Sequence, residues 1–182
     1  MIVNGPKLVR LAPVSPMPTS KQREHGVSWG LTEAGIDVRI RQTVEFIPPN
    51  VVALWGAFQR DDAVAAERAM HGYVLVDGEM TLGRSALAST VETFDIPTDL
   101  VAVLYDKSTH ARRFVTAWSG TVAEPGWRGG LTLELTFNGL DPLTIPAGSG
   151  IAQVLFHRLS DPAQYDGAYQ DQPDRPVEAV AW

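Results

Sequence analysis

Glu134 is one of the carboxylates of this sequence that could move protons. It stands between Leu133 and Leu135, an alternation typical of a strand whose other face is apolar. A carboxylate held beside such a face, in a largely dry pocket, can act first as a base toward water and then as an acid toward a leaving group. The alternative is a solvated glutamate on the outside of a strand, which is the commoner case for an isolated residue.

A short polar segment, residues 107–112, carries groups that bind phosphate. Lys107, Ser108 and Arg112 bring an ammonium, a hydroxyl and a guanidinium close together, and the guanidinium can hold two phosphate oxygens at once. His110 lies among them and suggests a general base, although a packing role or a subunit contact fits it better. The alternative for the whole segment is a charged turn between two strands.

The composition excludes several other chemistries. The chain has 182 residues and no cysteine, so disulfides and thiol nucleophiles are excluded and a structural zinc site is not expected. The zinc-dependent route to cytidine deamination is excluded as well, because its ligand set needs a pair of cysteines. The net charge of −6 comes with no long basic stretch, which argues against nucleic acid as a partner but is compatible with a small anionic ligand.

Length and hydropathy predict one domain. A chain of this length with 45% hydrophobic residues can bury a single core. No apolar run approaches the roughly 20 residues that cross a bilayer. The N-terminus lacks the apolar core of a signal peptide, so we expect a cytoplasmic protein with no membrane partner.

The elements that position the polar groups are expected to be mostly strands. Strand patterns recur at residues 36–40, 73–76, 86–93, 100–105, 131–137 and 151–157. The dipeptide Asp77-Gly78 predicts a hairpin turn. Residues 61–70, followed by Gly72, are the one segment that predicts a helix. Many short strands with one or two short helices predict a mainly β fold, a jelly roll or a β-barrel.

Three regions are expected along the chain. Residues 1–30 contain four prolines and predict an irregular N-terminal arm with at most short structure. Residues 31–160 contain the strand patterns and predict the barrel domain. Residues 161–182 are polar and rich in proline, and they predict either a frayed C-terminal tail or a lid that orders over a ligand.

Four segments together resemble the dCTP deaminase family of the dCTP deaminase/dUTPase superfamily. Residues 33–39 are similar to its early "GxDxRL" strand, and residues 87–112 to its run from "LAxTxE" through "PxDL" to the nucleotide loop. Residues 124–134 resemble "DPGW" followed by a strand with "LE", and residues 151–156 are close to "IxQLxF". Each motif is weak alone, but their order and spacing match over most of the chain. The resemblance implies a distorted jelly roll or β-barrel of the dUTPase-like fold.

The resemblance also implies an activity and a site. The activity is metal-free hydrolytic deamination of a deoxycytidine nucleotide, with dCTP as the expected substrate, which supplies dUTP and dUMP for thymidylate synthesis. Glu134 matches the catalytic glutamate, with Ser108 and Arg112 close to the attacking water, whereas dUTPases typically have an aliphatic residue at the position of Glu134. The residues implied in nucleotide binding are Lys107, Ser108, Thr109, His110, Ala111, Arg112, Gly120, Glu124, Trp127, Thr132, Leu133, Gln153, Tyr165, Tyr169 and Gln172.

The partners implied by the resemblance are other copies of the chain and a metal ion carried by the substrate. The family implies a homotrimer with active sites shared between subunits. Mg²⁺ is expected to bind with the nucleotide phosphates rather than to activate water, and no zinc is expected.

Two departures from the family pattern leave alternatives open. Glu124 replaces the usual aspartate before "PG", and Ala168 replaces a lysine that binds the terminal phosphates. Either Arg175 substitutes for that lysine, or the substrate is a monophosphate or diphosphate. The alternative functions are a dUTPase, a bifunctional dCTP deaminase and dUTP diphosphatase, and a non-catalytic nucleotide-sensing protein on the same fold.

Overall fold

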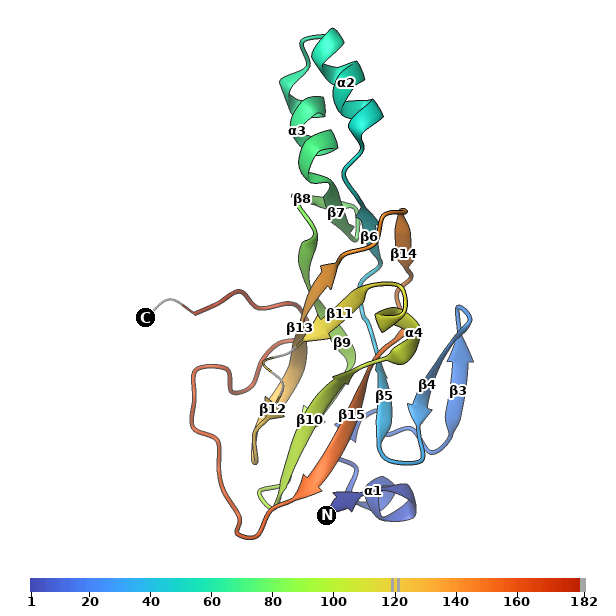
Figure 1. Ribbon diagram of the computed structural model, residues 1–182. Helices are drawn as coiled ribbons and strands as arrows, with labels where there is room; N and C mark the ends of the chain where they lie inside the picture. The colour runs from blue at the N-terminus through green and yellow to red at the C-terminus, as the bar shows by residue number, and fades with distance from the viewer. Residues whose placement is uncertain (119, 121, 181–182) are drawn as a thin grey trace.

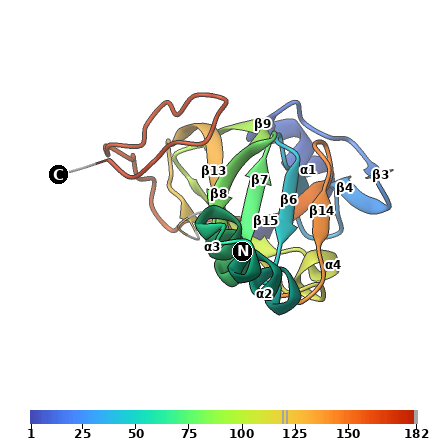
Figure 2. The same cartoon turned by 90° about the horizontal axis from the view of Figure 1, so that it is seen from above.

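The computed structural model describes residues 1–118, 120 and 122–180. Within these residues the chain forms three antiparallel sheets that curl around one hydrophobic core (Figures 1 and 2). The mainly β fold expected from the recurring strand patterns is confirmed.

The largest sheet contains seven strands. They are β1 (Ile2–Val3), β3 (Lys21–Glu24), β4 (Val27–Leu31), β5 (Ile36–Arg39), β10 (Leu100–Asp106), β12 (Val122–Ala123) and β15 (Gly150–Arg158). Their order is β12-β10-β15-β5-β4-β3, with β1 also paired to β15. The two longest strands of this sheet, β10 and β15, are hydrogen-bonded neighbours.

The other two sheets contain four strands each. The second has the order β11-β13-β9-β2, and its members are β2 (Val14–Ser15), β9 (Ser85–Asp95), β11 (Val115–Trp118) and β13 (Arg128–Phe137). The third has the order β14-β6-β7-β8, and its members are β6 (Val44–Ile47), β7 (Tyr73–Val76), β8 (Glu79–Leu82) and β14 (Leu143–Ile145). The six segments predicted as strands from the sequence correspond to β5, β7, β9, β10, β13 and β15.

The predicted hairpin turn and the predicted end of the helix are both found in the structure. Asp77 and Gly78 both have positive φ, 48° and 85°, and join β7 to β8 as a tight hairpin. The predicted helix is α3 (Ala63–His71), which begins where the Asp62 carboxylate accepts a hydrogen bond from the Ala65 amide at 3.0 Å. It ends at Gly72, where φ is 71°.

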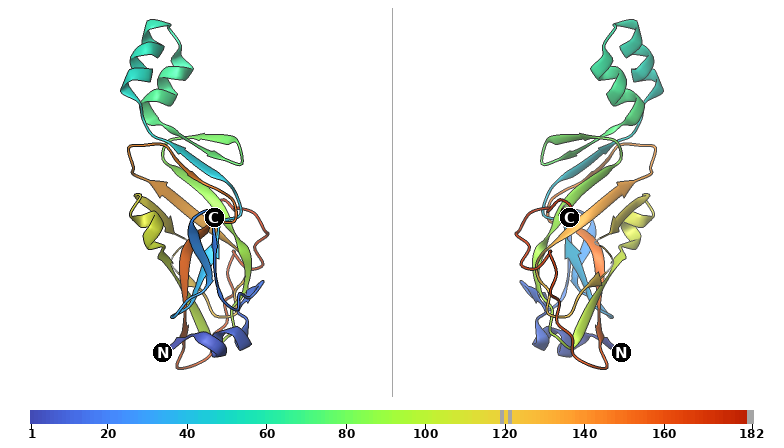
Figure 3. Two further views of the ribbon diagram at one scale, coloured as in Figure 1. Left: turned by 90° about the vertical axis from the view of Figure 1, so that its right-hand side faces the viewer. Right: turned by 90° about the vertical axis from the view of Figure 1, so that its left-hand side faces the viewer.

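The described residues contain four short helices rather than the one or two expected. The additional ones are α1 (Gly5–Leu11), α2 (Val51–Gln59) and the single turn α4 (Ser108–Ala111). The sequence of α2 carries no charge, so it lacks the apolar stripe with a polar opposite face that predicts a surface helix. Its start is marked by Asn50, whose side chain accepts from the Ala53 amide. Together α2 and α3 form a helical hairpin that projects beyond the sheets (Figure 3).

The two ends of the chain both pack against the barrel. In the N-terminal region, Val3, Leu8 and Val14 are buried in the main core, and β3 with β4 adds a hairpin to the largest sheet. Residues 161–180 form no helix or extended strand, but Gln172 makes an isolated bridge to Gly129 of β13. No helix within the described part of the chain is long and apolar enough to span a membrane.

Candidate active site

A pocket of about 410 Å³ lies between β13, the turn after β12 and the C-terminal tail. Eight of the residues predicted from the sequence to form the site line this pocket. They are Gly120, Glu124, Trp127, Thr132, Glu134, Tyr165, Tyr169 and Gln172. These residues are separated by up to about fifty positions in the chain, so their convergence is a property of the tertiary structure.

Glu134 projects from the solvent side of β13 into this pocket. Its neighbours across the sheet are Trp118 on β11 and Leu87 on β9. Leu133 and Leu135 point the other way and are buried in the core, as the period of two along a strand requires. Glu134 is therefore an exposed carboxylate fixed to a strand between two apolar side chains. Leu133, predicted to bind nucleotide, places its side chain in the core instead of the pocket.

The tail closes one side of the pocket through hydrogen bonds to β13 and the turn before it. The Trp127 indole N–H donates to the Tyr169 carbonyl at 2.6 Å. The Thr132 hydroxyl donates to Gln172 Oε1 at 3.2 Å and accepts from the Val177 amide at 3.1 Å. Thr132 therefore connects two points of the tail to the strand that carries Glu134.

A glycine allows this close approach of the tail. A Cβ atom at Gly129 would lie 2.5 Å from the Gln172 nitrogen, and the φ of Gly129 is 138°, a value that side chains disfavour. The next amide, of Gly130, donates to the Gln172 carbonyl at 3.0 Å. A side chain at position 129 would displace the segment that carries Gln172.

The predicted phosphate-binding segment lies outside the pocket of its own chain. Ser108 and Arg112 are exposed at the two ends of α4, with Thr109 half-buried and Ala111 exposed between them. Lys107 is buried and pairs with the Asp37 carboxylate on β5, while its ammonium also donates to Ser28 Oγ at 3.1 Å. The structure gives Lys107 a structural partner that the sequence did not reveal.

Gln153 is also separate from the pocket. It lies on β15, half-buried, and its side-chain amide donates to the Thr32 hydroxyl at 3.3 Å. It belongs to the same region of the largest sheet as the buried pair of Lys107 and Asp37, because Gln153 is opposite Asp37 in the strand register.

His110 is a buried histidine whose imidazole contacts the barrel. Its Nε2 lies 2.9 Å from the Gly150 carbonyl, which fits a donated hydrogen bond. Burial lowers its pKa below the usual 6.5, and the nearby charges of Arg113 and Lys107 act in the same direction, against the hydrogen bond to Gly150. The imidazole is therefore neutral in the folded protein at neutral pH.

The lowered pKa of His110 predicts a pH dependence of stability. The unfolded chain takes up a proton near pH 6.5 and the folded chain only at lower pH, so the free energy of unfolding falls as the pH drops below 6.5. The loss is at most about 1.4 kcal/mol per pH unit. Urea denaturation at pH 7.5 and 5.5 should show a larger loss for the wild type than for His110→Gln. His25→Gln, at an exposed histidine, is the matched control and should behave as the wild type.

The charged side chains among the described residues that line the pocket are all acidic. Its lining contains the carboxylates of Glu124 and Glu134 and, within the described residues, no lysine, arginine or histidine. Arg175 lies in an adjoining open hollow of about 890 Å³ that shares Glu134 with the pocket. A bound phosphate chain would need cations beyond those that line the pocket of one chain.

Six apolar residues of the pocket lining were not predicted from the sequence to belong to the site. They are Leu87, Val122, Ala123, Leu131, Val177 and Ala179. Their side chains carry no chemistry, and only the packing of the tail against β13 and β9 shows that they surround Glu134. In the part of the chain that the structure describes, no group of three or more His, Asp or Glu side chains is arranged to hold a metal ion.

Comparison with known proteins agrees with the motif order. A family model described as dCTP deaminase-like matches residues 24–159. A dCTP deaminase of Gluconobacter oxydans (strain 621H) is 30% identical over 155 residues, which cover 83% of this chain and 79% of that protein. A dCTP deaminase of Campylobacter fetus subsp. fetus is 34% identical over 154 residues, covering 80% of this chain and 78% of that protein.

Solved structures give a more distant similarity. Native EIAV dUTPase is 12% identical with a TM-score of 0.47, covering 86% of this chain and 98% of that one. The 2′-deoxycytidine 5′-triphosphate deaminase from Agrobacterium tumefaciens is 15% identical with a TM-score of 0.47, covering 83% of this chain and 45% of that one. The family model matches most of the chain, and curated relatives reach 30% identity over a similar length. This protein belongs to the dCTP deaminase-like family.

Proposed function

We propose that this protein hydrolytically deaminates a deoxycytidine nucleotide, with dCTP as the first substrate to test, to the deoxyuridine nucleotide and ammonia. The observation that carries the proposal is Glu134, a carboxylate on a strand at the wall of a pocket lined by aromatic and aliphatic side chains. Membership of the dCTP deaminase-like family supports this choice of substrate and reaction.

The proposed chemistry uses Glu134 twice. Its carboxylate takes a proton from water as the oxygen attacks the ring carbon that bears the exocyclic amine. The same proton then passes to the amine nitrogen, the carbon–nitrogen bond breaks, and ammonia leaves. The second proton of the water moves from the new hydroxyl to the adjacent ring nitrogen, so the ring keeps the new oxygen as a carbonyl. The reaction consumes one water and releases one ammonia, and it needs no redox partner. Glu124, in the same pocket, is proposed to contact the sugar hydroxyl.

The cations for the phosphates are proposed to come from a second copy of the chain. The pocket lining has two carboxylates and no cation among its described residues, while Ser108 and Arg112 are exposed on the α4 segment outside it. A homotrimer in which each pocket receives residues 108–112 of a neighbour would place a guanidinium opposite Glu134. Mg²⁺ enters with the nucleotide, as the counter-ion of its phosphates.

The first test is to incubate the purified protein and Mg²⁺ with dCTP, dCDP, dCMP or dUTP and to separate the products by ion-exchange chromatography. We expect a deoxyuridine nucleotide and one equivalent of ammonia from a deoxycytidine nucleotide. Because Ala168 stands where the family has a phosphate-binding lysine, the comparison also measures how much the terminal phosphates matter. Cleavage of dUTP alone would instead identify a dUTPase, and binding without turnover would indicate a nucleotide sensor.

A further inference from the structure

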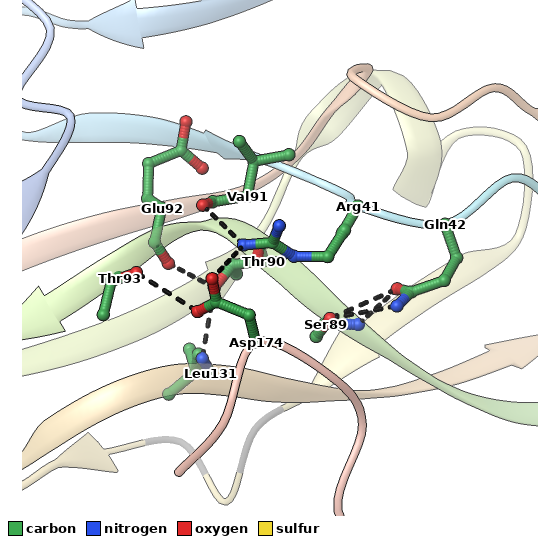
Figure 4. A network of polar contacts seen from close by, with 9 residues as sticks. All are labelled: Arg41, Gln42, Ser89, Thr90, Val91, Glu92, Thr93, Leu131 and Asp174. Carbon is green, nitrogen blue, oxygen red and sulfur yellow. Dashed lines mark hydrogen bonds and ion pairs between the residues drawn. The ribbon is translucent and has the colours of Figure 1, made fainter. Parts of the chain in front are cut away.

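The C-terminal tail is fastened to the barrel by a polar contact outside the pocket. The Asp174 carboxylate lies 3.4 Å from Arg41 Nη2 and accepts a hydrogen bond from the Thr93 hydroxyl at 3.4 Å (Figure 4). Arg41 follows β5, Thr93 lies on β9, and Asp174 lies in the tail. This contact, here called the tail latch (Arg41, Thr93 and Asp174), joins three segments that are distant in sequence.

The guanidinium of Arg41 is held in place by β9 independently of the tail. Its Nε donates to the Thr90 carbonyl at 3.2 Å and its Nη2 to the Val91 carbonyl at 3.0 Å, as Figure 4 shows. The Arg41 amide also donates to the Ser89 carbonyl at 2.8 Å. Because these bonds already restrict the side chain, little conformational freedom is lost when Asp174 arrives.

The latch lies between the two points at which the tail is bonded to the pocket wall. Gln172 precedes Asp174 by two residues and accepts from the Thr132 hydroxyl, and Val177 follows by three and donates to the same hydroxyl. Gln172 also lines the pocket, as does Val177. Because the Asp174 carboxylate is fixed between them, a shorter segment of the tail is free to move, and Gln172 and Val177 both stay close to Thr132.

We propose that Arg41 is a positioning residue that acts through Asp174 to hold the tail closed over the nucleotide. The predicted effect of Arg41 on turnover rests on the proposed function, whereas its predicted effect on the docking of the tail does not. The side chains of the pair are 33% and 60% exposed, so the attraction is partly screened by solvent and salt. An exposed pair of this kind shifts an equilibrium by up to about fivefold.

Hydrogen exchange tests the latch without reference to activity. The Gly130 amide bonds to the Gln172 carbonyl and the Val177 amide to Thr132, so both report whether the tail is docked. Asp174→Asn should accelerate their exchange about threefold to fivefold, and Asp174→Glu should restore most of the protection. Asp166→Asn is the control: this exposed tail carboxylate has no hydrogen bond or ion pair within the described residues. Unchanged exchange in Asp174→Asn would overturn the proposal.

A double-mutant cycle tests whether Arg41 acts through Asp174. Arg41→Gln also removes the bonds to the Thr90 and Val91 carbonyls, so its own effect is mixed. If the charges of Arg41 and Asp174 interact, the Val177 amide should exchange no faster in the double variant, Arg41→Gln with Asp174→Asn, than in Arg41→Gln alone. Additive acceleration would overturn the role of Arg41.

Steady-state kinetics distinguish a failure of the tail latch from a failure of the proposed function. In an active enzyme, Asp174→Asn should raise KM for the deoxycytidine nucleotide about threefold to fivefold and leave kcat nearly constant, because closure favours binding rather than chemistry. A constant KM alongside faster exchange would overturn the link to the nucleotide. If the wild type turns over none of the nucleotides, the proposed function fails, and hydrogen exchange still decides whether the latch holds the tail.

Discussion

Glu134→Gln should bind dCTP as the wild type does and lose deamination by about a thousandfold. The amide has nearly the shape of the carboxylate but takes no proton from water, and general base catalysis is worth about a hundredfold to ten-thousandfold in rate. Calorimetry measures the binding, and release of ammonia measures the rate. Glu178→Gln is the matched control, because it makes the same change in the hollow next to Glu134 and should keep the rate. Full activity of Glu134→Gln would contradict the proposed mechanism.

The same variant tests whether two subunits share a site. Arg112→Ala should also be inactive, because it removes the exposed guanidinium proposed to reach the pocket of a neighbour. When the two inactive variants are unfolded and refolded together, some mixed sites should combine an intact Glu134 with an intact Arg112. Partial recovery of activity is the expected result. If both residues act within one chain, mixing restores nothing.

Lys107→Met should lower the free energy of unfolding by about 3 kcal/mol or more, because it leaves the Asp37 carboxylate buried without its partner. Both side chains are less than one-tenth exposed, at 9% and 5%, so solvent screens the pair little. Urea denaturation measures the loss. Lys21→Met is the control: Lys21 pairs with Glu33 at 3.9 Å on the surface, with exposures of 52% and 88%, and its loss should cost at most about 1 kcal/mol.

A second substitution separates the structural role of Lys107 from a role in binding phosphate. The double variant Lys107→Met with Asp37→Leu removes both buried charges and should recover most of the lost stability. A dCTP dissociation constant measured in this folded variant then reports on binding alone. Failure of the double variant to regain stability would contradict the assignment of the pair as the cause of the loss.

Local physical chemistry determined much of the fold from the sequence. A period of two along β13 and β9 follows from the pleat of a strand, whatever the strand packs against. Asp77-Gly78 formed its hairpin because both positions need positive φ, and α3 began at Asp62 because a carboxylate there satisfies a free amide. The order of four motifs also indicated the family, because that order does not depend on where each segment lies in space.

Which of the predicted residues come together in the site was decided by the tertiary structure. Lys107 has the charge of a phosphate ligand, but its partner Asp37 is 70 positions away, and no local pattern reveals that pairing. The helix α2 lacks the polar face that would mark it in the sequence, since Gln59 at its end is its one polar side chain. The docking of the tail depends on contacts of Gln172, Asp174 and Val177 with strands far back in the chain. Contacts between segments distant in the sequence determine which of the predicted residues lie near Glu134, and these contacts exist only in the folded chain.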